Sequence, residues 1–119
     1  MSHTSLKASK TDLLALIPGP ISEQWPRGEP YAKAMQHGAM SVALYAPGKD
    51  ESQILREQDE VYLISTGLGQ LVIDGKLNDF GPGDVFLVPA GMPHTFKNYT
   101  VDFTAWTVSH RPKSRSSAS

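Results

Sequence analysis

The chain has 119 residues, which fits a single domain, and it contains no cysteine. The lack of cysteine excludes disulfides, a zinc–thiolate site and a thiol nucleophile, and it is compatible with a reducing compartment. The formal net charge of −1 gives no electrostatic signal for binding to nucleic acid or to an anionic membrane. We therefore expect a soluble, cytoplasmic protein that binds neither.

Residues 1–36 are expected to form an irregular N-terminal arm that is partly disordered, because they begin with a small, polar and basic stretch. One short helical turn is expected over 11–17, capped at its start and ended by Pro18. The apolar run 13–17 is too short for a signal-peptide core or a membrane span. The rest of the arm holds Trp25, which we expect to pack on the folded domain or on a second subunit.

Strand patterns fill residues 37–110, the expected folded domain. Each apolar stretch is short, rich in β-branched and aromatic residues, and bounded by Pro, Gly or Asp-Gly. The expected strands are 39–45, 60–66, 70–73, 76–80, 85–88, 94–98 and 103–108. Asp74-Gly75 predicts a two-residue hairpin turn. Such strands are typical of an all-β sandwich or barrel, and the basic, serine-rich residues 111–119 are expected to be a disordered tail.

Two spaced motifs carry the most specific information in the sequence. The first reads Gly48, five residues, Ile54-Leu55-Arg56, three residues, Glu60, six residues and Gly67. The second reads Pro82-Gly83, five residues, Pro89-Ala90-Gly91, two residues, His94, three residues and Asn98. The Pro-Gly pairs favour tight turns on both sides of one short strand, and these turns fix where the following histidine points.

The two motifs resemble those of the cupin family, whose first motif is Gly, five residues, His-x-His, three or four residues, Glu, six residues, Gly. Glu60 and both glycines match, but Ile54 and Arg56 stand at the two histidine positions. The chain thus looks like a small single-domain cupin of the conserved-barrel type. The resemblance implies an all-β double-stranded β-helix, the cupin jelly-roll barrel, and makes a homodimer expected. It also implies that positions 54, 56, 60 and 94 face the barrel interior.

Metal binding is disfavoured, because only Glu60 and His94 among the four implied ligands are metal-capable. The guanidinium of Arg56 offers five donors, has no acceptor and stays charged. About 4 Å from a divalent cation, it would contribute a repulsion of about 8 kcal/mol at an effective dielectric constant near 20. We expect a degenerate metal site without a cofactor, with Glu60 and His94 as the ligands if a metal does bind.

Side chains of equal parity share one face of a strand, so those from 54 to 62 are expected to line the barrel together. Arg56 pairs with Glu60, binds an anionic group of a ligand, or reaches solvent. Glu60 and His94 are the candidate catalytic residues because they are able to move a proton. The alternative is a structural ion pair for Glu60 and a backbone hydrogen bond for His94. The expected ligand-binding residues are Arg56, Tyr62, Phe96, Gln58 and Ile54.

Three functions fit these residues. The preferred one is a barrel that binds a small anionic or polar ligand without catalysis, anchored by Arg56. The second is a metal-independent isomerase, epimerase or lyase, in which His94 and Glu60 transfer a proton and Arg56 stabilises negative charge. The third is a metal-dependent, dioxygenase-like cupin with an altered coordination shell.

Overall fold

A computed structural model describes residues 6–48, 57–111 and the backbone of 53–54. In this part of the chain one short helix, α1 (Lys10–Leu14), precedes nine strands. The strands are β1 (Tyr31–His37), β2 (Met40–Tyr45), β3 (Gln53–Ile54), β4 (Asp59–Thr66), β5 (Gly69–Ile73), β6 (Lys76–Phe80), β7 (Val85–Val88), β8 (His94–Lys97) and β9 (Thr104–His110). Arg56, most of the tail 111–119 and the first residues of the arm lie outside the described residues.

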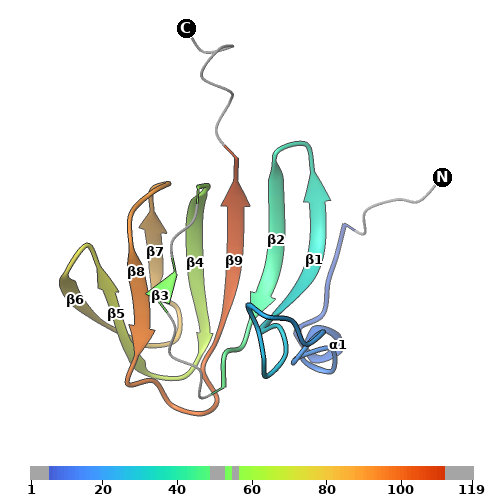
Figure 1. Ribbon diagram of the computed structural model, residues 1–119, viewed down its shortest axis with the longest axis horizontal. Helices are drawn as coiled ribbons and strands as arrows, with labels where there is room; N and C mark the ends of the chain where they lie inside the picture. The colour runs from blue at the N-terminus through green and yellow to red at the C-terminus, as the bar shows by residue number, and fades with distance from the viewer. Residues whose placement is uncertain (1–5, 49–52, 55–56, 112–119) are drawn as a thin grey trace, which may run out of the picture.

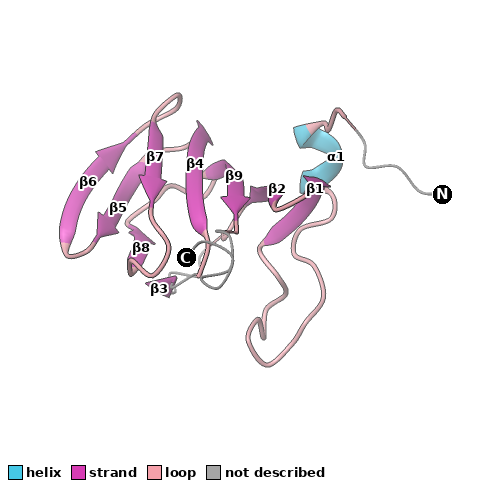
Figure 2. Ribbon diagram, turned by 90° about the horizontal axis from the view of Figure 1, so that it is seen from above, coloured by secondary structure: helices cyan, strands magenta, loops and turns pink. Residues whose placement is uncertain are grey.

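The strands form two antiparallel sheets, one of five strands in the order β1-β2-β9-β4-β7 and one of four in the order β3-β8-β5-β6. The two sheets are the walls of a jelly-roll barrel, and the larger one extends past the smaller at β1 and β2 (Figures 1 and 2). The expected all-β fold is confirmed. No helix in the described residues has the length and apolar character needed to span a membrane.

Seven of the nine strands match the expected ones to within about two residues at each end. The Asp74-Gly75 turn is also confirmed, since it joins β5 to β6 with φ of 49° and 82° at its two residues. β1 was not expected, and it lies largely within the segment predicted to be an irregular arm. A register shift between Lys33 and Met35 interrupts its pairing with β2, and this irregularity hides the alternation that marks a strand.

The N-terminal helix differs in its limits from the expected turn over 11–17. It begins at Lys10, after an N-cap Ser9 whose side chain makes no capping hydrogen bond, and it ends at Leu14. Thr11 therefore lies within the helix. Leu13 is the buried residue of α1, and it packs on Ala32 and Leu44 against the outer face of β1 and β2.

The expectation that residues 54 to 62 share one face of a single strand is wrong. Ile54 is in β3, which pairs with β8 in the smaller sheet, whereas Glu60 is in β4 of the larger sheet. The chain crosses from one wall of the barrel to the other between these residues. Sequence parity is valid only within one regular strand, so it does not relate Ile54 to Glu60.

The inner face of the five-stranded sheet changes from polar to aromatic along its strands. Cα partners in antiparallel strands present their side chains on the same face, so the register defines residue rows. The row at the polar end is Ser41, Ser109, Glu60 and Val88, the next is Ala43, Thr107, Tyr62 and Phe86, and the third is Tyr45, Ala105 and Ile64. The barrel therefore has a polar end, at the row of Ser41 and Glu60, and an apolar end, at the row of Tyr45 and Ile64.

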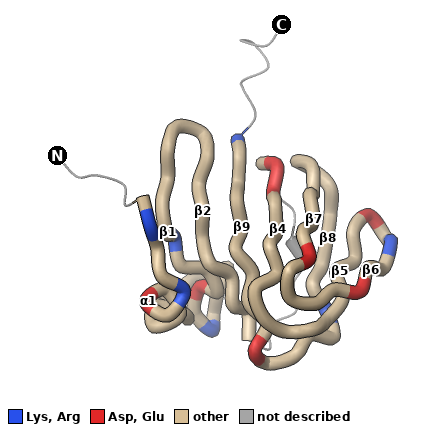
Figure 3. Tube along the Cα trace, turned by 180° about the vertical axis from the view of Figure 1, so that it is seen from behind, with Lys and Arg blue, Asp and Glu red and all other residues tan. Residues whose placement is uncertain are grey.

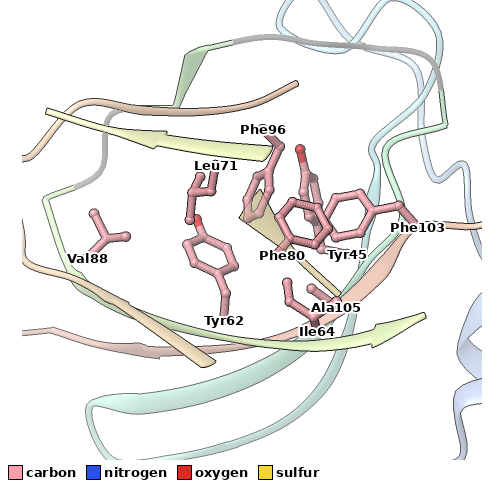
Figure 4. Close-up of a cluster of buried hydrophobic side chains, with 9 residues drawn as sticks. All are labelled: Tyr45, Tyr62, Ile64, Leu71, Phe80, Val88, Phe96, Phe103 and Ala105. Atoms are coloured by element: carbon pink, nitrogen blue, oxygen red, sulfur yellow. The ribbon is translucent and has the colours of Figure 1, made fainter. Parts of the chain in front are cut away.

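Aromatic rings fill the apolar end of the barrel (Figure 4). The ring centroid of Phe103 lies 4.9 Å from that of Phe80 and 5.0 Å from that of Phe96. Tyr45 adds a fourth ring, 5.5 Å from Phe96. Centroid separations in this range are typical of favourable aromatic pairs, which stabilise a core beyond the area they bury. This cluster holds the two sheets together.

Candidate functional site

His94 begins β8 and is almost fully buried, with 2% of its surface exposed. Its Nδ1 lies 3.0 Å from the carbonyl oxygen of Met92, and its Nε2 lies 2.7 Å from the hydroxyl oxygen of Tyr62. A carbonyl oxygen only accepts, so Nδ1 carries a hydrogen and donates it. In the neutral ring the Tyr62 hydroxyl then donates to Nε2, and both ring nitrogens are used within the protein.

Tyr62 is fully buried in β4 and links His94 to the aromatic core. Its ring packs edge-on against Phe96, with centroids 4.9 Å apart and an interplanar angle of 84°. Figure 4 shows the Tyr62 hydroxyl turned away from Phe80 and Phe103. The structure therefore brings together Tyr62, Phe96 and His94, three of the predicted site residues, as one buried group.

A cavity of about 270 Å³ lies beside the polar row of the five-stranded sheet. Residues of the N-terminal arm, of the inner faces of β1, β2, β9 and β4, and Gln58 just before β4 line it. These are Gln24, Trp25, Glu29, Tyr31, Lys33, Ser41, Ala43, Gln58, Glu60, Thr107 and Ser109. Two predicted site residues are among them, Gln58 and Glu60, and Glu60 is only 1% exposed. The cavity therefore brings the N-terminal arm next to the polar row that holds Glu60.

The N-terminal arm forms one side of this cavity through Trp25. The ring centroid of Trp25 lies 6.1 Å from that of Tyr31 on β1, with the rings edge to face. Tyr31 in turn stacks on Tyr45, at a centroid distance of 4.7 Å. The arm thus packs on the folded domain, which was one of the two placements expected for Trp25.

Sequence reasoning missed most of the cavity. Thr107 and Ser109 lie at alternate positions of β9, and Ser41 is the β2 partner of Ser109, so the alternating hydroxyl residues of the last strand were the available signal. Lys33 and Tyr31 were missed because β1 was not recognised. Predicting their approach to Glu60 requires the order β1-β2-β9-β4, which joins strands far apart in the chain.

The described residues do not fit a bound metal ion. They contain no cluster of three or more His, Asp or Glu side chains that would hold one. Both ring nitrogens of His94 are engaged by Tyr62 and Met92, so this histidine has no lone pair directed at a metal. Ile54 is opposite His94 in the β3–β8 register, and an isoleucine supplies no ligand atom. The absence of a cofactor stays a prediction.

The chain belongs to the cupin family, since the family model described as a cupin domain matches residues 41–113. An uncharacterized protein of Streptomyces coelicolor is 33% identical over 86 residues, which are 71% of this chain and 82% of that protein.

Solved structures with a similar fold include a cupin. A cupin 2 conserved barrel domain protein from Salinispora arenicola is 26% identical, with a TM-score of 0.57 over 67% of this chain and 73% of that one. A putative mannose-6-phosphate isomerase from Ralstonia eutropha is 16% identical, with a TM-score of 0.61 over 69% of this chain and 83% of that one. The second likeness concerns the fold alone.

Proposed function

We propose that this cupin binds a small polar molecule in the cavity between the N-terminal arm and the inner face of the five-stranded sheet, without catalysis and without a metal. The observation that carries the proposal is the cavity itself, whose lining combines hydroxyl, amide and carboxyl groups with two aromatic rings. A concave site with convergent polar groups and aromatic walls is what a small polar ligand requires.

The charges of the described lining favour a neutral polar ligand over an anion. Glu29 and Glu60 contribute two carboxyl groups, and Lys33 contributes one ammonium group. The ammonium of Lys33 already donates to the side-chain oxygen of Gln36, at 2.9 Å. The earlier expectation of an anionic ligand depends on Arg56, which lies outside the described residues. Hydroxyl and amide groups on the ligand would pair with Gln24, Gln58 and Ser109.

Proton transfer by His94 and Glu60 has less support. His94 is not among the residues that line the cavity, and its ring is held between Tyr62 and Met92. A general base must come within hydrogen-bond reach of the proton that it removes. Glu60 lines the cavity and His94 does not, so the carboxyl group of Glu60 is the better placed of the two for a ligand bound there.

The test is a thermal-shift screen with sugars, polyols, hydroxy acids and amino acids, followed by titration calorimetry of each compound that raises the melting temperature. A ligand that binds only the folded state stabilises it by mass action. Ser109→Phe places a phenyl ring in the cavity and should weaken binding at least about tenfold, which corresponds to about 1.4 kcal/mol.

Thr95→Phe is the matched control, because Thr95 is also a half-buried hydroxyl residue in a strand but lies on the outer face of the smaller sheet. It should leave the affinity unchanged. Two outcomes would contradict the proposal: no compound stabilises the protein at millimolar concentration, or Ser109→Phe binds as tightly as the unmodified chain.

A further inference from the structure

A groove lies outside the barrel, between α1 with the loop that follows it and the loop that joins β8 to β9. We call it the side groove, and its volume is about 500 Å³. Figure 1 shows α1 and the loop after it beside the ends of β1 and β2. The described residues that line the side groove include none of those that line the cavity beside Glu60. The side groove is therefore a separate site.

Most of the side groove is apolar. Its apolar lining consists of Leu14, Ile17, Pro18, Ala46, Val101 and Phe103. Leu14 is 37% exposed and Val101 is 76% exposed, so apolar surface meets solvent on both walls. Past Ile17, Pro18 and Ala46 the groove continues into a smaller hollow of about 210 Å³, which these residues also line. An apolar chain has room to lie along this floor.

Lys10 places a positive charge on the α1 wall of the side groove. It is half-buried, and its Nζ donates to Oγ of Ser65 at 3.1 Å and to Oγ1 of Thr66 at 3.2 Å. An ammonium group has three hydrogens, so these two bonds leave one for another acceptor. Both acceptors are neutral hydroxyl groups, and among the described residues Lys10 has no carboxylate partner. The charge is therefore not neutralised by this part of the chain.

A network of hydroxyl groups fixes the position of the Lys10 ammonium. Thr66 Oγ1 donates to the carbonyl oxygen of Asp102 at 2.6 Å, so its one hydrogen is used. It then accepts from Lys10 and from Thr104, whose Oγ1 is 2.7 Å away. A hydroxyl group with one donated and two accepted bonds is saturated. The network joins the end of β4, the start of β9 and the β8–β9 loop, so the fold itself holds the charge in place.

The charges around the side groove have to be assigned residue by residue, because Figure 3 shows basic and acidic positions together near α1. The described lining of the groove and its hollow holds two cations, Lys10 and Arg27, and one carboxylate, Asp102. Oδ1 of Asp102 already accepts from the hydroxyl of Thr100 at 2.6 Å. The cavity beside Glu60 has the opposite balance, with two carboxyl groups and one ammonium group. The side groove therefore favours an anionic group.

We propose that the side groove binds a small carboxylate that carries an apolar chain. The carboxylate accepts the third N–H of Lys10 in a charge-assisted hydrogen bond. The apolar chain lies against Leu14, Ile17 and Val101 and extends toward the hollow, where its removal from water stabilises the complex. This site goes beyond the polar ligand proposed for the barrel cavity and does not depend on it.

A nuclear magnetic resonance titration of the isotope-labelled full chain with octanoate tests the proposal. Saturable shifts are expected at the backbone amides of Leu14, Ala46 and Val101, with a Kd below about 1 mM. Acetate has the charge without the chain, and octanol has the chain without the charge, so each should bind at least about tenfold more weakly. Shifts that do not saturate, shifts confined to other parts of the chain, or equal affinity for octanol would overturn the proposal.

Two substitutions of lining charges should act in opposite directions. Lys10→Met removes the ammonium group, keeps an unbranched side chain and should weaken octanoate binding at least about tenfold. Asp102→Asn removes the carboxylate, keeps an acceptor for Thr100 and should strengthen binding about twofold or more. Lys76→Met is the matched control, because Lys76 is an exposed lysine on β6 that does not line the groove, and it should leave the affinity unchanged.

A third variant keeps the test valid if Lys10→Met loosens α1. Val101 is largely exposed, so Val101→Glu adds a carboxylate to the groove without emptying a packed position, and it should weaken octanoate binding at least about tenfold. Leu77→Glu, at a position 58% exposed on β6, is its control. Ser109→Phe should also leave octanoate binding unchanged, which separates this site from the barrel cavity. Binding that survives both Lys10→Met and Val101→Glu, that falls equally in Leu77→Glu, or that is lost in Ser109→Phe would contradict the proposal.

Discussion

His94 illustrates how one buried hydrogen bond changes the chemistry of a side chain. In the motif frame it stands at a ligand position, yet its ring donates to the Met92 carbonyl and accepts from the Tyr62 hydroxyl. Without either of these hydrogen-bond partners, one ring nitrogen of His94 would be buried with no hydrogen bond, which costs about 1–3 kcal/mol. The pair thus fixes the ring within the aromatic core, and its first consequence is for stability.

Tyr62→Phe should lower the free energy of unfolding by about 1–3 kcal/mol, because it removes the hydroxyl and leaves Nε2 of His94 buried without this donor. The ring of Tyr62 keeps its contact with Phe96, so packing changes little. Urea denaturation followed by fluorescence measures the loss.

The control for this prediction is the cycle that adds His94→Leu. If the two side chains are coupled, the double variant should lose less stability than the two single losses together. Additive losses would show that the 2.7 Å contact contributes nothing.

The candidate site was only partly predictable at the level of single residues. The resemblance to the cupin motifs selected Glu60 and His94 as interior residues, and both are almost fully buried. Their surroundings were not predictable, since Tyr62 reaches His94 across the barrel and Ser109 reaches Glu60 from the last strand. Such contacts depend on strand order, which local patterns do not encode.

At the scale of strands and turns, two glycines with nearly the same φ differ in their surroundings. Gly67 has φ of +94°, and a Cβ added there would lie 2.5 Å from the Cα of Phe103. Gly83 has nearly the same φ, +93°, but a Cβ there would meet nothing within 4 Å. Gly67 joins β4 to β5 where the backbone passes close to the aromatic core, whereas Gly83 only turns the chain.

Gly67→Ala should therefore destabilise the protein more than Gly83→Ala. The positive φ costs about 1–2 kcal/mol for alanine at either position. The close approach to Phe103 adds about 1–3 kcal/mol at position 67, because the backbone atoms there must move. Thermal unfolding by circular dichroism, with both variants compared at one temperature, gives the difference. Equal losses would mean that the chain around Phe103 relaxes without cost.

The strands were largely predictable from sequence, and the exceptions have identifiable causes. β5 and β6 followed from alternating apolar residues around Asp74-Gly75, a turn whose φ values suit Asp and Gly. β1 was missed because of its irregular register, and β3 because two residues are too few to form a pattern. Regular elements depend on local chemistry, whereas these two are stabilised by their partner strands.

The whole molecule contains two apolar clusters on opposite faces of one sheet. The larger lies inside the barrel and includes Leu71 and Phe96 from the smaller sheet. The second lies on the outer face, where α1 contributes Leu13 against Ala32 and Leu44. The strands of the barrel are paired independently of α1, so the second cluster is able to open while the first stays closed. We therefore expect α1 to open at a lower free energy than the barrel unfolds.

The same substitution in the two clusters should therefore have different effects. Leu71 is fully buried between the sheets, so Leu71→Ala should reduce global stability by about 2–5 kcal/mol and accelerate hydrogen exchange in β4 and β9 as well as in β5. Leu13→Ala makes the same change in α1, where detachment of the helix limits the loss. It should accelerate exchange at the backbone amides of α1 and leave the slowest amides of β4 and β9 unchanged. Hydrogen-exchange mass spectrometry on both variants measures this, and uniform acceleration in Leu13→Ala would show that helix and barrel unfold as one unit.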